Sequence, residues 1–166
     1  MTLNIMIGIP GSGKSKVVSG MKGEDDIIIC PDSIRKEITG NISDQSQNKL
    51  VWEVAYERLN AADENTWFDA TNLSISSINK IINNSKGFDN IRLLIMTSSK
   101  NAEMCYRRIQ EDLKNGLDRS DVPWEIVDNM QKKFFNLLGE DRLNLRRYMD
   151  NFNENQDEVE MNIVMF

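Results

Sequence analysis

Residues 8–15 decide the fold of this chain, and they read Gly8-Ile9-Pro10-Gly11-Ser12-Gly13-Lys14-Ser15. This stretch matches the Walker A pattern without a gap, and it joins an apolar, strand-like segment to a helical one. Glycines let the backbone curl so that successive N–H groups point at phosphate oxygens, and the helix N-terminus adds positive potential. The motif therefore predicts an ATP-binding loop made of residues 8–15 and Lys16.

Two residues of the motif carry specific chemistry. Lys14 can reach the β- and γ-phosphates of ATP, and Ser15 can give its hydroxyl oxygen to Mg²⁺. We therefore expect ATP and Mg²⁺ as cofactors, with Lys14 as a catalytic residue. Two other interpretations are open, namely a Gly-rich turn that resembles the motif by chance and a protein that binds nucleotide without catalysis.

The composition is that of a globular protein, because 40% of the 166 residues are hydrophobic and 28% are charged. Histidine is absent from the sequence, so that a general base must be Asp, Glu, Lys, Cys or Tyr. The net charge of −6 argues against broad, nonspecific adhesion to nucleic acid. No apolar run has the length of a membrane span and the N-terminus lacks the pattern of a signal peptide, which predicts a soluble, cytoplasmic protein.

Strand-like and helical segments alternate along the chain, which predicts a parallel sheet with helices on both faces. We expect strands at residues 3–9, 27–30, 66–70, 92–96 and 159–166. We expect helices at residues 14–21, 33–39, 43–63, 75–82, 101–114 and 123–138. The polar residues 151–157 suggest a loop, and the whole chain, 1–166, is expected to form one domain.

The second strand leads directly into a candidate catalytic helix, Pro31-Asp32-Ser33-Ile34-Arg35. Because the carboxyl ends of parallel strands face the ligand crevice, Asp32 is expected where an acceptor hydroxyl meets the γ-phosphate and can take its proton. Arg35 shares that helix face and can hold a phosphate of the acceptor. The alternatives are that Asp32 caps the helix, which is compatible with catalysis, and that Arg35 is a solvated surface residue.

The third strand ends in a second polar stretch, Asp69-Ala70-Thr71-Asn72. Its position at a strand terminus predicts that Asp69 lies beside the crevice, where it can hold a Mg²⁺-bound water or orient the acceptor. Asn72 is predicted to contact the acceptor as well. The alternative is that Asp69 merely caps the turn at Thr71 and Asn72.

The second half of the chain contains a candidate lid. Arg107, Arg108 and Arg119 flank a polar segment, Glu111 to Asp121, that lies between two predicted helices. Such a segment suits a lid, expected at about residues 107–123, that closes over the triphosphate and supplies guanidinium charge. Ordinary solvated helix surface is the alternative for each of these arginines.

Taken together, these residues resemble the polynucleotide kinase-like branch of the P-loop kinases, including the kinase domain of phage-type 5′-hydroxyl polynucleotide kinases. The resemblance spans nearly the whole chain, and its marks are GIPGSGKS at residues 8–15, Asp32-x-x-Arg35, DATN at residues 69–72, and an arginine-bearing stretch that ends in Val122-Pro123. It implies a three-layer α/β fold with a helical lid and a five-stranded parallel sheet in the order 2-3-1-4-5.

The resemblance also implies transfer of the γ-phosphate of ATP to the 5′-hydroxyl of a polynucleotide. It implies Lys14 on the phosphates, Ser15 on magnesium, Asp32 as general base and Arg35 on a phosphate of the acceptor. Arg108 and Arg119 correspond to the lid arginines, and because the spacing between them is longer than in the phage enzyme, Arg107 can replace Arg108.

The acceptor stays open, because related kinases also act on modified bases in DNA, on nucleosides or on small metabolites. A nucleotide-dependent binding module without phosphotransfer is a further alternative. The length of 166 residues leaves no room for a phosphatase domain, so kinase activity without 3′-phosphatase activity is expected.

Overall fold

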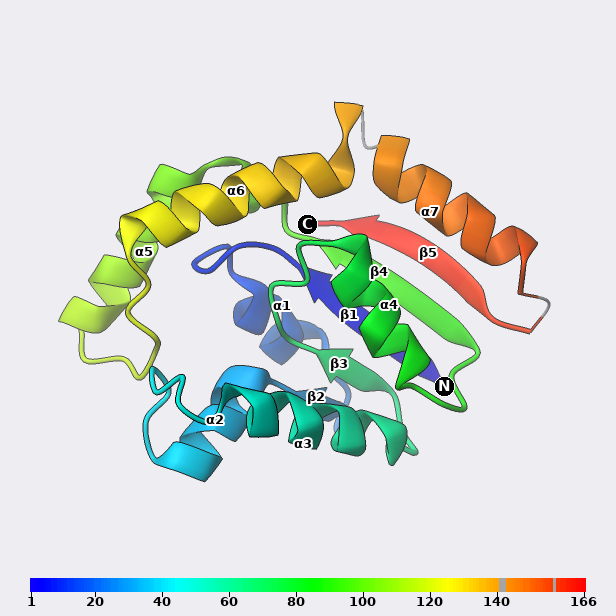
Figure 1. The fold of residues 1–166 in the computed structure, drawn as a ribbon, viewed down its shortest axis with the longest axis horizontal. Helices are drawn as coiled ribbons and strands as arrows, with labels where there is room; N and C mark the ends of the chain where they lie inside the picture. The colour runs from blue at the N-terminus through cyan, green and yellow to red at the C-terminus, as the bar shows by residue number, and fades with distance from the viewer. Residues whose placement is uncertain (141–142, 157) are drawn as a thin grey trace.

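The computed structural model describes residues 1–140, 143–156 and 158–166, and its centre is a five-stranded parallel sheet (Figure 1). The strands are β1 (Thr2–Ile7), β2 (Ile27–Ile29), β3 (Thr66–Phe68), β4 (Asn90–Ile95) and β5 (Glu160–Met165). They pair in the order β2-β3-β1-β4-β5, and all four pairs are parallel. The structure thereby confirms the sheet that the resemblance implied.

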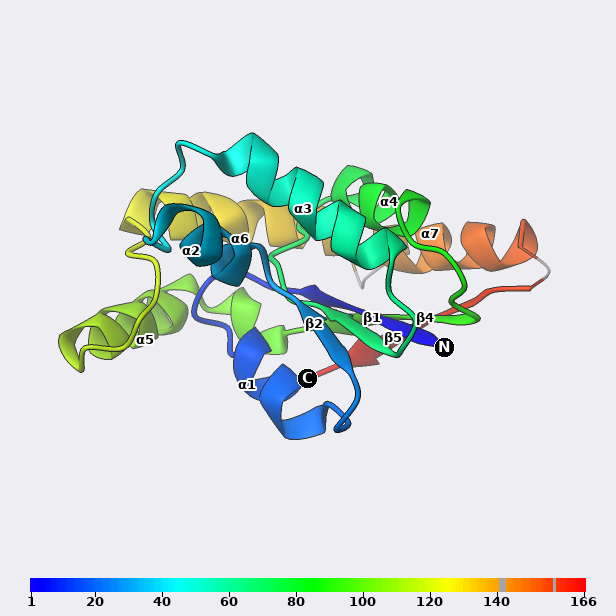
Figure 2. The same ribbon diagram turned by 90° about the horizontal axis from the view of Figure 1, so that it is seen from below.

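Helices cover both faces of this sheet. They are α1 (Lys14–Met21), α2 (Pro31–Thr39), α3 (Asn48–Asn60), α4 (Ile75–Asn83), α5 (Ala102–Lys114), α6 (Trp124–Leu138) and α7 (Leu143–Glu154), with a short 3₁₀ helix, η1 (Thr97–Lys100). Helix α1 lies on one face, and α3, α4, α6 and α7 lie on the other (Figure 2). Within the described part of the chain, no helix is long and apolar enough to cross a bilayer.

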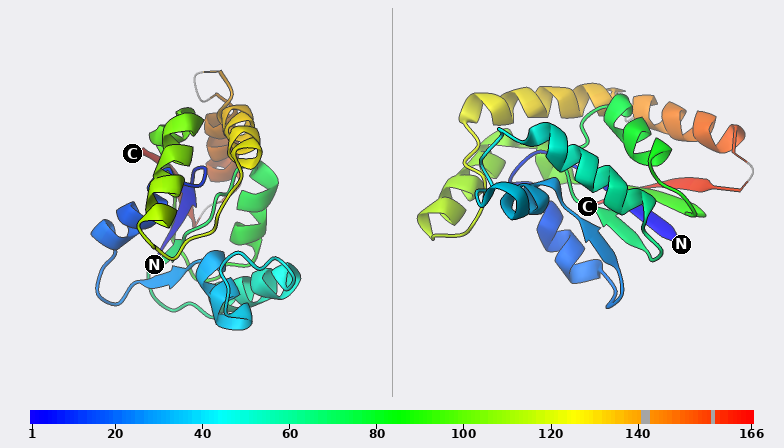
Figure 3. Two further views of the ribbon diagram at one scale, coloured as in Figure 1. Left: turned by 90° about the vertical axis from the view of Figure 1, so that its left-hand side faces the viewer. Right: turned by 60° about the horizontal axis from the view of Figure 1, so that its bottom comes forward.

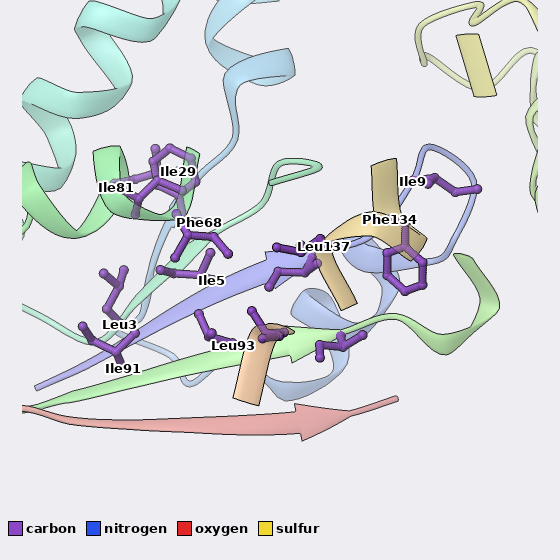
Figure 4. Close-up of a cluster of buried hydrophobic side chains, with 14 of the residues drawn as sticks. Leu3, Ile5, Ile9, Ile29, Phe68, Ile81, Ile91, Leu93, Phe134 and Leu137 are labelled. Carbon is purple, nitrogen blue, oxygen red and sulfur yellow. The ribbon is translucent and has the colours of Figure 1, made fainter. Parts of the chain in front are cut away.

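The larger core lies between the sheet and the helices α3, α4, α6 and α7. Because side chains alternate along a strand, Leu3, Ile5 and Ile7 of β1 all point to this side and are fully buried. Figure 4 shows Leu3 and Ile5 in this cluster. Phe134 of α6 is buried in the same cluster. The residues between them face α1, where Met6 packs in a smaller cluster that includes Val18. Apolar residues on both faces of β1 fix it at the centre of the sheet.

Two details differ from the sequence prediction. The residue that caps α2 is Cys30, and Asp32 lies inside the first turn, so the interpretation of Asp32 as the N-cap is wrong. Helix α7 was not predicted, and it extends to Glu154, through the first part of the loop expected at residues 151–157. Residue 157 of that loop lies outside the described residues. Leu145 is fully buried on α7, so tertiary packing stabilises this helix, most of which lies in a segment for which no element was predicted.

Candidate active site

The phosphate-binding loop lies between the end of β1 and the start of α1. Gly11 and Gly13 have positive φ angles of 80° and 93°, which other residues adopt at a cost in strain. A Cβ atom on Gly11 would also stand 2.2 Å from the carbonyl oxygen of Cys105. The loop therefore packs against α5 through a contact that only glycine permits.

Two serines of η1 hold this loop from outside. The hydroxyl of Ser99 accepts a hydrogen bond from the backbone N–H of Ile9 at 3.1 Å, and the hydroxyl of Ser98 donates to the carbonyl of Ser12 at 2.7 Å. Sequence reasoning missed both serines. The available signal was their position in a polar run immediately after a buried strand, at the edge where the carboxyl ends of the strands meet.

Lys14 lies within the curve of the loop. Its Nζ donates hydrogen bonds to the carbonyl oxygens of Gly8 and Ile9, each at 3.0 Å. Burial lowers the pKa of Lys14, while the negative charges of Asp69 and Asp32 oppose that shift. The two carboxylates that the sequence singled out are therefore close enough to act on the lysine of the loop. Lys16, also predicted to bind ATP, is exposed on α1.

Ser15 and Asp69 form the link between the loop and the third strand. The Ser15 hydroxyl donates to the Asp69 carboxylate, with 2.7 Å between Oγ and Oδ2. The Asp69 side chain thus contacts Ser15, whereas the alternative interpretation assigned it to the Thr71–Asn72 turn. Asp69 is 7% exposed and follows β3 directly. A hydroxyl and a carboxylate oxygen at this distance form a donor set that suits Mg²⁺, which prefers oxygen ligands and keeps several waters.

Asp32 and Arg35 face each other on one side of α2. An Arg35 terminal nitrogen donates to the Asp32 carboxylate, and its other terminal nitrogen lies 3.1 Å from Oδ1 of Asn48. Only 6% of the Arg35 side chain is exposed, so the interpretation of Arg35 as a solvated surface residue is wrong. The Asp32 side chain is 54% exposed, which leaves its carboxylate accessible to an acceptor.

Of the three candidate lid arginines, Arg108 lies beside the loop. A terminal nitrogen of Arg108 lies 3.5 Å from the carbonyl oxygen of Gly11, and Arg119 forms an ion pair with Asp112. Burial raises the pKa of the Cys105 thiol, and the positive charges of Arg108, Lys14 and Arg119 oppose that shift. Arg107 is exposed and shows no side-chain hydrogen bond or ion pair within the described residues.

The segment 115–123 reaches across to α2 and the loop that follows it. Lys36 of α2 forms an ion pair with Asp118, and the hydroxyl of Ser120 donates to the carbonyl of Ile42 at 3.2 Å. Figure 3 shows this connection, in which the stretch between α5 and α6 descends beside the α2–α3 loop. The segment thus spans from the phosphate loop to the helix that carries Asp32.

Asn72 has a structural task. Its side-chain nitrogen donates to the carbonyl of Met6 at 2.7 Å, and its backbone adopts a positive φ of 50°. The residue is 3% exposed. Since this bond joins the turn after β3 to β1, it fixes the strand end that carries Asp69. The predicted contact of Asn72 with an acceptor stays a prediction.

The sheet order and the loop after β1 define the P-loop kinase fold, whose proteins bind nucleotide phosphates through such a loop. A family model described as an AAA domain matches residues 3–137. The chain belongs to this AAA domain family. No curated protein sequence matches the chain significantly.

Solved structures agree with the fold. A chain of the Pnkp1/Rnl/Hen1 RNA repair complex aligns with 81% of this chain at a TM-score of 0.69 and 16% identity, and the alignment spans 44% of that longer chain. A gluconokinase from Sinorhizobium meliloti 1021 aligns with 98% of this chain and 82% of its own, at a TM-score of 0.50 and 17% identity. The family match and these two structures agree on the P-loop fold.

The hydrogen bond of Asn72 leads to a prediction on stability. Asn72→Ala should lower the free energy of unfolding by about 1–3 kcal/mol, because the buried Met6 carbonyl loses its partner. Asn72→Gly removes the same bond but accepts the positive φ, so it should be less damaging than the alanine variant. Urea unfolding of the three proteins measures both differences, and two variants as stable as the wild type would contradict the assignment.

The lowered pKa of Lys14 predicts a pH dependence. The charged lysine is disfavoured in the folded state, so the unfolded state binds more protons between the lowered pKa and the ordinary value of 10.5. The free energy of unfolding of the wild type, relative to Lys14→Met, should therefore rise with pH in that window. Denaturant unfolding of both proteins from about pH 7 to about pH 10 tests this sign. A difference that is constant or falls with pH would show that Lys14 carries no burial penalty.

Proposed function

We propose that this protein is an ATP- and Mg²⁺-dependent kinase that phosphorylates the 5′-hydroxyl of a polynucleotide. The observation that carries the proposal is the Asp32–Arg35 pair on α2, whose carboxylate acts on the same lysine as Asp69 does. A nucleotide-binding module without phosphotransfer needs neither an accessible carboxylate nor a buried arginine beside its phosphate loop. A phosphotransferase with an anionic alcohol acceptor uses both.

In this proposal each residue has one task. Backbone N–H groups of residues 8–15 and the ammonium group of Lys14 bind the phosphates, and Ser15 and Asp69 hold Mg²⁺. The metal ion supplies charge that offsets the negative charge of the triphosphate. Asp32 takes the proton of the acceptor hydroxyl while the hydroxyl oxygen forms a bond to the γ-phosphorus. The bond between the γ-phosphorus and the bridging oxygen breaks, and ADP leaves with its electron pair. Arg35 holds a phosphate of the acceptor.

The segment 107–123 acts as a lid in this proposal. Its contacts with α2, through Lys36 and Ile42, support a role in closing the site on the acceptor side. Arg108 is the better candidate than Arg107 for the first lid arginine, because it contacts the phosphate loop at Gly11. Arg119 is the second, and its ion pair with Asp112 ties it to α5.

A small hydroxyl-bearing molecule is the second candidate acceptor. The alignment with a gluconokinase over 98% of the chain favours it. The alignment with a chain of an RNA repair complex, at the higher TM-score, supports the nucleic-acid end. The two candidates differ in which molecule receives the γ-phosphate, so transfer of a labelled phosphate distinguishes them.

The direct test is transfer of γ-³²P from ATP, with Mg²⁺, to an oligonucleotide with a 5′-hydroxyl. The wild type should label this oligonucleotide, whereas Lys14→Ala and an oligonucleotide that already carries a 5′-phosphate should give no label. ATP binding without labelled oligonucleotide would contradict the polynucleotide acceptor, and labelling of nucleosides or sugars instead would establish the second candidate.

The role of Asp32 is tested separately by Asp32→Asn. This variant should lower kcat by roughly 10²–10⁴ because the amide cannot take the proton of the hydroxyl, while binding of ATP is unchanged. Steady-state kinetics and calorimetry measure the two effects. The matched control is Asp44→Asn, which removes a partly exposed carboxylate after α2 and should leave kcat at the wild-type value. An Asp32→Asn enzyme as fast as the wild type would remove Asp32 from the reaction.

A further inference from the structure

The environment of Arg35 contains a residue that has no place in the reaction described so far. Arg35 is a buried cation, and burial of a charge is costly unless partners compensate for it. One terminal nitrogen pairs with Asp32, and the other donates to Oδ1 of Asn48 at 3.1 Å. Its Nε is buried without a hydrogen-bond partner among the described residues. Asp32 and Asn48 therefore hold the guanidinium at both terminal nitrogens, and they use only two of its five N–H donors, so each terminal nitrogen keeps a second N–H that neither of them uses.

Asn48 reaches this arginine from another element. It is the first residue of α3, and the loop after α2 separates it from Arg35 in the sequence. Since its amide is neutral, it orients the guanidinium without cancelling the positive charge. A carboxylate in its place would leave two acidic groups around one cation. The Arg35 guanidinium thus has one charged partner, Asp32, and one neutral partner, Asn48, which only orients it.

We propose that Asn48 is a positioning residue that holds the Arg35 guanidinium toward an acceptor phosphate adjacent to the sugar with the reactive hydroxyl. This inference rests on the proposed function and deepens it, because it names the residue that orients Arg35 for the acceptor phosphate. A guanidinium held in one plane binds a phosphate with less loss of side-chain entropy than a free one. Asn48 acts through Arg35 and touches neither ATP nor the reacting hydroxyl.

The test compares two acceptors, a nucleoside 3′-monophosphate with a free 5′-hydroxyl and the same nucleoside without the phosphate. Asn48→Ala should raise the Kd and KM of the phosphorylated acceptor about tenfold, because one hydrogen bond to a charged group is lost. The KM of ATP and the Kd of the plain nucleoside should stay unchanged. Asn48→Asp keeps the accepting oxygen but adds a negative charge, so it should weaken binding of the phosphorylated acceptor further.

A double-mutant cycle shows whether Asn48 works through the arginine. In an Arg35→Lys background, a single ammonium group replaces the two terminal nitrogens that bind Asp32 and Asn48. Asn48→Ala should therefore have little further effect on acceptor binding in that background. The matched control is Asn60→Ala at the exposed end of the same helix, which should behave like the wild type. Equal effects of Asn48→Ala in both backgrounds would mean that Asn48 merely stabilises α3, and would overturn the inference.

The outcomes separate this inference from the proposed function. Calorimetry with a non-hydrolysable ATP analogue measures acceptor binding without any transfer. A wild type that binds the phosphorylated acceptor through Asn48 but transfers no phosphate would refute the kinase and leave the inference standing. A wild type that transfers phosphate while Asn48→Ala binds both acceptors normally would refute the inference alone. Binding of neither acceptor would refute both.

Discussion

The hydrogen bond between Ser15 and Asp69 is the interaction on which the rest of the site depends. It joins the start of α1 to the end of β3, and the neighbouring backbone extends the connection. The N–H of Asp69 donates to the carbonyl of Ile29 in β2, and the N–H of Gly8 donates to the carbonyl of Thr71. Three strand ends and the phosphate loop are therefore held at one edge of the sheet, where the dipole of α1 and the buried lysine face two carboxylates.

Charge balance explains how this edge tolerates so many ionisable groups. Lys14 lies between the loop carbonyls and the field of Asp69 and Asp32, and Arg35 is paired with Asp32. A polyanion that enters such a site exchanges water for fixed donors and cations, which is the arrangement that stabilises phosphoryl transfer. The contacts of segment 115–123 with α2 are made between residues of the protein alone. They bring Arg119 toward the same edge of the sheet before any acceptor binds.

The sequence predicted the local features of this protein well, because those depend on neighbouring residues. The loop at 8–15, the five strands and the position of Asp69 follow from strand patterns and from the rule that parallel strands end at one edge. Contacts between distant segments were not predictable. Asn48 and Ser99 act on residues 13 and 90 positions away, and of the two only Ser99 carries a local signal, its place in a polar run after a buried strand.

Helix α7 escaped prediction although the sequence carries a signal for it. Its apolar residues recur at helical spacing, at Leu145, Tyr148, Met149 and Phe152, and they pack on the core. The burial of Arg35 was not predictable, because the sequence around an arginine does not show whether its side chain is exposed to solvent or packed against another element. Tertiary structure thus changed the expected environment of Arg35 and the capping of α2, and it added Ser98, Ser99 and Asn48 to the residues around the site.

The most direct test of the account is whether Ser15 and Asp69 make nucleotide binding depend on the metal ion. Calorimetry with a non-hydrolysable ATP analogue, with Mg²⁺ and with EDTA, compares the wild type with Asp69→Asn. We expect Mg²⁺ to tighten binding in the wild type, and the variant to lose about tenfold or more of that gain while binding the metal-free analogue normally. Equal affinities with and without Mg²⁺ in the wild type would contradict the assignment of this edge as a metal–triphosphate site.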